Sequence, residues 1–142
     1  MAEIKALMTR FYQEVLNEGR LQAIDELCAP EIVNHEAPPE FPRGLEGVRA
    51  WVNMFRAGAP DLHVTVEDVI AEGDRGVARV VFRGTHKGDL YGIPPTGKEF
   101  TIESIDIVRV ERDKAVEHWG LTDVASMMEQ LGVLPATQAA KT

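Results

Sequence analysis

The sequence has little cysteine and no clusters of positive charge. Cys28 is the only cysteine among 142 residues. A single cysteine excludes an intramolecular disulfide and an all-cysteine metal site, and its apolar neighbours predict an inert buried thiol. The net charge is −8, and the basic residues are scattered singly among acidic ones. This pattern argues against nucleic acids and anionic membranes as partners, because both bind positively charged surfaces.

Long apolar runs are also absent. The first residues, MAEIKALMTRFYQEVL, are charged and amphipathic, unlike a signal peptide. No segment approaches the ~18 apolar residues of a membrane span. We therefore expect a cytoplasmic protein in a reducing compartment, without membrane contact. The length predicts one domain, over residues 1–135, followed by a loose tail at 136–142.

The first third of the chain has helical periodicity. Apolar residues recur at helical spacing over residues 3–18, 20–28 and 45–56, which predicts three amphipathic helices. Between the second and third helices, residues 31–36 form a brief extended piece. A proline-rich loop follows at 37–44.

Strand patterns dominate the remainder. Residues 62–73, 76–88, 99–111 and 114–123 are rich in β-branched side chains and roughly alternate in polarity, which predicts four strands. A short helix is expected to close the fold at 125–135. Helices followed by strands in series indicate an α+β fold with an antiparallel sheet. If the sheet is strongly bent over the helices, it leaves a cavity, and such cavities are common ligand sites.

The last two strands carry a possible acid–base pair. His118 shares a strand face with Gly120, and Asp106 shares a face with Phe100 and Ser104, because side chains alternate. Asp106 and His118 lie on one side of the sheet if the connecting turn has an odd number of residues, and on opposite sides if the number is even. A carboxylate fixes the tautomer of an imidazole and raises its basicity. The alternative is a purely structural pair, although a carboxylate in the apolar strand IESIDIVRV needs some partner.

Other polar residues have both a functional and an ordinary interpretation. Tyr12 lies one residue beyond the stripe of the first helix and is either a hydrogen-bond donor or a solvated helix-edge aromatic. Asn34 is a donor or a loop cap, and His35 lies where it could line a cavity mouth. Trp119 is expected on the face opposite His118, packed against another element or a second subunit.

The sequence has no recognisable metal or nucleophile motif. The four histidines lack the i, i+4 spacing of a helical metal site, and no Cys/His cluster compensates, so we predict no metal. Ser104 has no nucleophile motif around it. The segment GIPPTG lacks the features of a phosphate loop and is expected to be a turn.

The chain resembles the SnoaL-like polyketide (ester) cyclases of the nuclear transport factor 2-like superfamily. The most specific segments are FRGTHKGDLYGIPPTGKEF and DIVRVERDKAVEHW, and the resemblance extends over about residues 4–135. It implies a cone of curved sheet and helices around a pocket, and a homodimer. It also implies cofactor-free, metal-free chemistry on a hydrophobic carbonyl compound, in which a carboxylate removes a proton next to a carbonyl and the enolate closes a ring.

The family's acid–base residue is an aspartate directly after the His-Trp pair, and this sequence has Gly120 there. Three interpretations follow: an acid–base enzyme that uses His118 with Asp106, or with Asp123 or His35; a non-catalytic binding protein; and a dimerisation module. The catalytic candidates are His118 and Asp106. The candidate substrate-binding residues are Tyr12, Asn34, His35, Trp51, Phe55, Phe100, Ser104 and Gly120.

Overall fold

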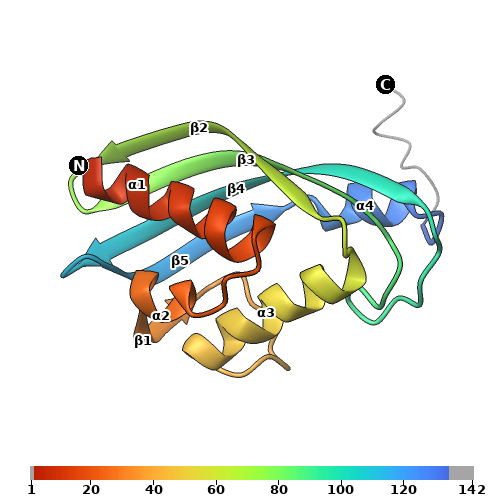
Figure 1. Ribbon diagram of the computed structural model, residues 1–142, viewed down its shortest axis with the longest axis horizontal. Coiled ribbons are helices and arrows are strands. Elements are labelled where there is room, and N and C mark those ends of the chain that lie inside the picture. Colours follow the sequence, from red (N-terminus) through yellow and green to blue (C-terminus); the bar gives the residue numbers. More distant parts are fainter. Residues whose placement is uncertain (1, 135–142) are drawn as a thin grey trace.

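A computed structural model describes residues 2–134. Within these residues a single sheet is covered by helices (Figure 1). The helical segments are α1 (Ala2–Arg10), which continues directly into the π-helical η1 (Phe11–Asn17), then α2 (Ala23–Leu27), α3 (Leu45–Gly58) and α4 (Val124–Gln130). None of these helices is long and apolar enough to cross a membrane. The predicted tail at 136–142 and Pro135 lie outside the described residues, and the single-domain boundary at 135 remains a prediction.

The sheet has five strands in the order β1-β5-β4-β3-β2. They are β1 (Cys28–Asn34), β2 (His63–Glu72), β3 (Arg75–Thr85), β4 (Glu99–Glu111) and β5 (Lys114–Thr122). The last four form the predicted antiparallel series. The expectation of a purely antiparallel sheet is wrong, however, because β1 pairs in parallel with β5. This pairing covers backbone groups of β5 that would otherwise form an open sheet edge.

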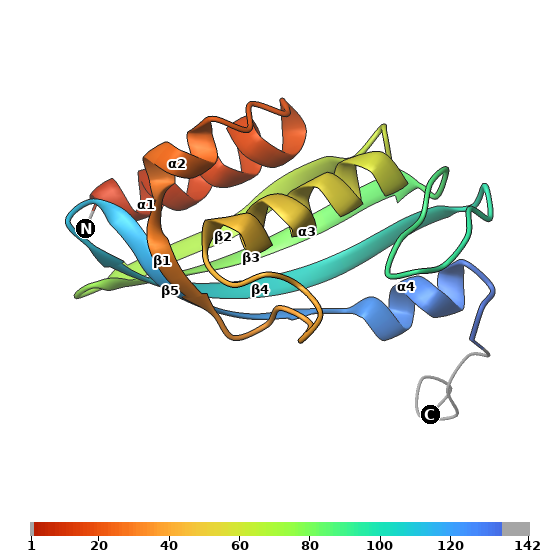
Figure 2. The ribbon, with the colours of Figure 1, turned by 90° about the horizontal axis from the view of Figure 1, so that it is seen from below.

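The longest helices and the core lie on one face of the sheet. In Figure 2, α1, α2 and α3 lie over the concave side of the strands, while α4 lies at one end. The first helix faces the sheet through residues spaced four apart, Ile4, Met8, Tyr12 and Leu16, all of which are buried. This spacing places Tyr12 on the buried stripe and not at the helix edge.

A bulge in the β4–β5 hairpin decides which side chains face the helices. The turn contains two residues, Arg112 and Asp113, both with positive φ. In a regular ladder this even number would put Asp106 and His118 on opposite faces. The pairing shifts between Arg109 and Val110, so that Val116 is an extra residue on β5. Beyond this bulge, Asp106 and His118 share the concave face.

Candidate active site

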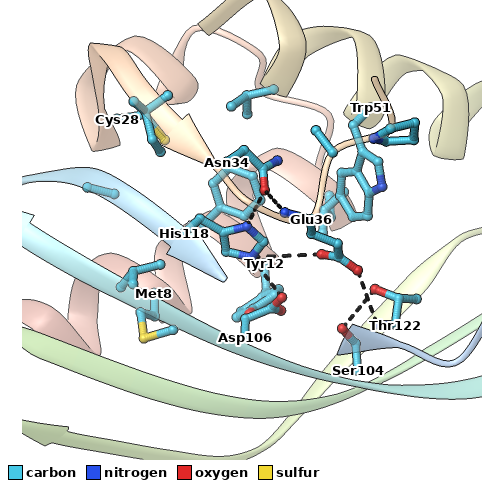
Figure 3. A pocket seen from close by; sticks show the side chains of 18 of the residues that line it. Met8, Tyr12, Cys28, Asn34, Glu36, Trp51, Ser104, Asp106, His118 and Thr122 are labelled. Carbon is cyan, nitrogen blue, oxygen red and sulfur yellow. Dashed lines mark hydrogen bonds and ion pairs between the residues drawn. The ribbon is translucent and has the colours of Figure 1, made fainter. Parts of the chain in front are cut away.

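A pocket of about 300 Å³ lies between the concave face of the sheet and the helices. Its wall is mostly apolar, formed by residues of α1, η1, α3 and the strands, while polar side chains gather at one end (Figure 3). The polar and amphipathic lining residues are Tyr12, Asn34, Glu36, Trp51, Tyr91, Ser104, Asp106, His118 and Thr122. An apolar cavity with a few convergent polar groups is the usual form of a small-molecule site.

Asp106 and His118 form the centre of the polar end. In the sheet Asp106 lies directly opposite Gly120, and His118 lies opposite Val108, so the pair is diagonal. The His118 Nε2 and Asp106 Oδ1 atoms are 2.9 Å apart. The two side chains are only 19% and 11% exposed, so their interaction is weakly screened by water.

Tyr12 donates a hydrogen bond to the other oxygen of Asp106. The distance from the Tyr12 hydroxyl to Asp106 Oδ2 is 2.5 Å. Burial, followed by the nearby charge of Asp106, raises the pKa of Tyr12 well above its usual value of 10.0. The phenol is therefore a neutral donor over the whole physiological range, which suits a charged carboxylate acceptor.

Asn34 fixes the orientation of the His118 ring. The Asn34 Oδ1 atom lies 2.7 Å from His118 Nδ1 and also accepts the backbone N–H of Glu36 at 3.0 Å. Since this oxygen is an acceptor, Nδ1 must carry the proton. The parallel pairing of β1 with β5 places Asn34 beside His118.

The contacts of the His118 imidazole with Asn34 and Asp106 require one proton to lie between His118 and Asp106. With Nδ1 already protonated, the short contact from Nε2 to Asp106 Oδ1 requires a hydrogen on one of these two atoms. The pair is then either imidazolium with carboxylate or imidazole with carboxylic acid, and in both forms one proton lies between the two atoms. Such a pair can give a proton to a ligand oxygen that becomes negatively charged.

Glu36 is a pocket residue that the sequence interpretation missed. Its Oε2 atom accepts the backbone N–H of Thr122 at 3.1 Å, and its Oε1 atom lies 4.0 Å from His118 Nε2. Alternation along residues 34–36 was the available signal, because it places Asn34 and Glu36 on one face and His35 on the other. From this segment the sequence predicted Asn34 and His35 as site residues but not Glu36.

Two further pairs of polar groups lie along the pocket wall. The Ser104 and Thr122 hydroxyls, on paired positions of β4 and β5, are 3.0 Å apart. The Trp51 indole N–H points to the Tyr91 hydroxyl at 3.3 Å. In each pair one hydroxyl hydrogen remains available, so both pairs can orient a polar group of a ligand.

Three of the predicted substrate-binding residues do not line this pocket. His35 lies on the outer face of the sheet, where its ring stacks on Trp119 at 5.1 Å and Nε2 contacts Glu117 at 2.7 Å. Phe55 and Phe100 are instead fully buried in the hydrophobic core and are among its largest side chains. Asp123, considered as an alternative acid, instead caps α4 by accepting the Ser126 N–H.

The remaining candidates lie at the pocket. Tyr12, Asn34, Trp51, Ser104, Asp106 and His118 all contribute to its wall, and Gly120 lies between Asp106 and Glu36. The Cys28 thiol also faces the pocket, and burial raises its pKa to about 12. It is therefore a thiol and not a nucleophilic thiolate at neutral pH.

Glu36, Asp106 and His118 also have the residue types of a metal site, with ligand atoms within 4.8 Å of one another. Their hydrogen bonds fit a different use. Both oxygens of Asp106 take part in hydrogen bonds, and both His118 nitrogens are engaged. An ion would have to replace the Asp106–His118 contact, so the geometry fits a proton-sharing network better than a coordination sphere.

Comparison with known proteins agrees with this architecture. The family model of the SnoaL-like polyketide cyclases matches residues 6–131. The chain is 30% identical over 124 residues to the nogalonic acid methyl ester cyclase of Streptomyces nogalater, covering 82% of this chain and 88% of that protein. It is 28% identical over 128 residues to the aklanonic acid methyl ester cyclase of Streptomyces peucetius, covering 88% of each.

Solved structures give the same result. TsrD from Streptomyces laurentii superposes with a TM-score of 0.86 and 34% identity, covering 94% of this chain and 97% of that chain. The predicted α+β, nuclear transport factor 2-like architecture is thereby confirmed, with the parallel β1 as its one departure from the expected sheet. The chain belongs to the SnoaL-like polyketide cyclase family.

Proposed function

We propose that the protein is a cofactor-free acid–base enzyme that closes a ring in a hydrophobic polyketide ester. The observation that carries this proposal is the network Tyr12–Asp106–His118–Asn34, buried at one end of an apolar pocket. Its polar groups can hold and transfer one proton, and the apolar remainder suits a polycyclic or long-chain substrate.

The chemistry needs no external reactant. A base removes a proton from a carbon next to a carbonyl, and the released electron pair forms a carbon–carbon bond to a second carbonyl carbon of the same molecule. The oxygen of that second carbonyl becomes an alkoxide and takes a proton. The His118–Asp106 pair is the proposed proton donor at this step, and the Tyr12 hydroxyl stabilises the Asp106 carboxylate that results.

The names of the relatives suggest the first substrates to test. We would incubate the protein with the methyl esters of nogalonic and aklanonic acid in deuterated water. Ring closure would be followed by chromatography, and deuterium incorporation by mass spectrometry. We expect turnover by the wild type and a loss of about 10²–10⁴-fold in kcat for Asp106→Asn and His118→Gln, the range for removal of an acid–base group.

Matched controls are available on the outer face and at the surface. Asp68→Asn and His63→Gln change exposed residues away from the pocket and should leave kcat unchanged. The competing function is a non-catalytic binding protein. Saturable binding of both esters, with neither ring closure nor deuterium incorporation, would favour that function and contradict the enzyme.

A further inference from the structure

The hydrogen bonds of the pocket raise the question of which group accepts the first proton. Both oxygens of Asp106 are already engaged, Oδ2 by the Tyr12 hydroxyl and Oδ1 by the proton shared with His118 Nε2. Both nitrogens of His118 are engaged as well. A base needs a free lone pair that faces the substrate. Neither nitrogen of His118 offers one while the network is intact, and each oxygen of Asp106 is already held by one contact.

Glu36 has such a lone pair. One of its oxygens, Oε2, is held by the Thr122 N–H, which fixes the carboxylate. Within residues 2–134 no hydrogen bond reaches the other oxygen, Oε1, whose neighbour is His118 Nε2 at 4.0 Å. The side chain is 23% exposed and lines the pocket, so a ligand can reach this oxygen.

Gly120 leaves the space that Glu36 occupies. A Cβ atom at position 120 would lie less than 3.0 Å from Glu36 Oε1 and from Asp106 Oδ1. Gly120 is not among the glycines with positive φ, so its backbone does not require glycine. The requirement is for space, and the group that fills this space is a carboxylate from a different element of the chain.

We propose that Glu36 is the catalytic base, supplied from the segment after β1 in place of an acid at position 120. This assignment rests on the proposed function. Glu36 Oε1 takes the proton from carbon, the electron pair forms the new carbon–carbon bond, and the alkoxide takes the proton held by His118 and Asp106. After product release Glu36 gives its proton to the solvent and the His118–Asp106 pair takes one up, so no proton is gained or lost in a cycle.

The decisive variants are Glu36→Gln and Glu36→Ala, assayed with the two methyl esters. Glutamine can still accept the Thr122 N–H but has no basic oxygen, so kcat should fall about 10²–10⁴-fold while KM changes little. In Glu36→Ala, added formate should restore part of the activity by entering the vacated space. Glu117→Gln, on the outer face, is the matched control and should behave as the wild type.

A relocation experiment tests the spatial part of the proposal. Gly120→Asp alone should lower both activity and melting temperature, because the new side chain meets the Glu36 carboxylate. In the double variant Glu36→Ala with Gly120→Asp, the clash with Glu36 is gone, the Asp106 and His118 side chains have to shift to make room, and a carboxylate stands on strand β5. We expect its kcat to exceed that of Glu36→Ala at least about tenfold.

The outcomes separate the two proposals. If the wild type and Glu36→Gln are equally active while Asp106→Asn is not, the assignment of Glu36 is wrong and the enzyme function stands. If Glu36→Gln does not fold, absence of formate rescue in Glu36→Ala overturns the assignment. A wild type that neither cyclises the esters nor exchanges deuterium overturns the proposed function, and with it the role of Glu36.

Discussion

Tyr12 and Tyr91 are the only tyrosines in the chain, and both line the pocket. Burial raises the pKa of Tyr91 to about 12 and that of Tyr12 well above 10.0. Because folding raises both pKa values, the unfolded chain loses these protons first. The free energy of unfolding should therefore be fully maintained below pH 10 and fall as the pH rises from 10 toward 12.

An alkaline ultraviolet titration measures this effect directly. We expect no phenolate absorbance in the folded protein at pH 10, where a free tyrosine is half ionised. Tyr91→Phe leaves Tyr12 as the only phenol, and its signal should appear only at higher pH or on unfolding. A midpoint near 10 in folded Tyr91→Phe would contradict the burial of Tyr12 against Asp106.

At this scale the sequence predicted the central pair but not its surroundings. An acidic residue in the apolar strand 99–111 indicated that Asp106 needs a partner, and His118 is that partner. Glu36 could not be selected in this way, because it follows a short strand whose neighbour the local sequence does not specify. Phe55 and Phe100 were predicted to line the pocket. Large aromatic side chains occur both in cavity walls and in the core, and the sequence does not distinguish these two positions.

Among the elements, the long connection between β3 and β4 depends on a buried histidine. His86 is fully buried; its Nδ1 accepts the Thr96 backbone N–H at 3.2 Å, and its Nε2 donates to the Ile93 carbonyl at 3.1 Å. These bonds tie together the two ends of a loop that contains little regular structure. The histidine is therefore expected to stabilise this loop and not to take part in chemistry.

His86→Ala should lower the free energy of unfolding by about 1–3 kcal/mol, because it removes the hydrogen bonds of a fully buried side chain to Thr96 and Ile93 and leaves a cavity in place of the ring. Chemical denaturation would measure the loss, and limited proteolysis should show new cleavage within residues 87–97. The exposed His63 is the matched control, and His63→Ala should change neither property. Equal stability and equal proteolysis of the two variants would exclude this role.

The elements themselves were largely predictable. Three helices and four strands follow from local periodicity of 3.6 and 2, and the structure confirms them with shifts of a few residues at their ends. The parallel pairing of β1 was not predictable, because the partner of a short strand depends on which sheet edge remains open after the hairpins form. The bulge at Val116 was also hidden, since nothing in the local sequence specifies an extra residue.

At the scale of the whole molecule, the outer face of the sheet carries an apolar row. Ile70, Val77, Ile107 and Trp119 are successive cross-strand partners on β2, β3, β4 and β5. Beside this row, Ile105 and Leu121 are paired and are 48% and 82% exposed. Ile70, Ile105 and Leu121 are exposed, and the other members of the row are half-buried. Apolar areas of this kind are typical of interaction surfaces, which favours the predicted homodimer.

We predict that the protein sediments as a dimer and that Leu121→Glu, which places a charge beside this row, shifts it toward a monomer. Sedimentation velocity over a range of concentrations would measure the change. Val133, which follows α4 and is 42% exposed, provides the control: Val133→Glu should leave the dimer intact. A wild type that is monomeric at all concentrations would contradict the prediction.

The extra residue in the β4–β5 hairpin, Val116, also determines where strand β5 can lose a residue without a change in the pocket. If Val116 were deleted, Val110 would still pair with Ala115 and Arg109 with Glu117, so His118 and Gly120 would keep their partners and their face. Deletion of Trp119 would instead place His118 and Gly120 on opposite faces. Loss of one residue therefore leaves the pocket intact at position 116 of this strand and disrupts it at position 119. Insertions and deletions in natural variants should accordingly occur on the turn side of His118 and not beyond it.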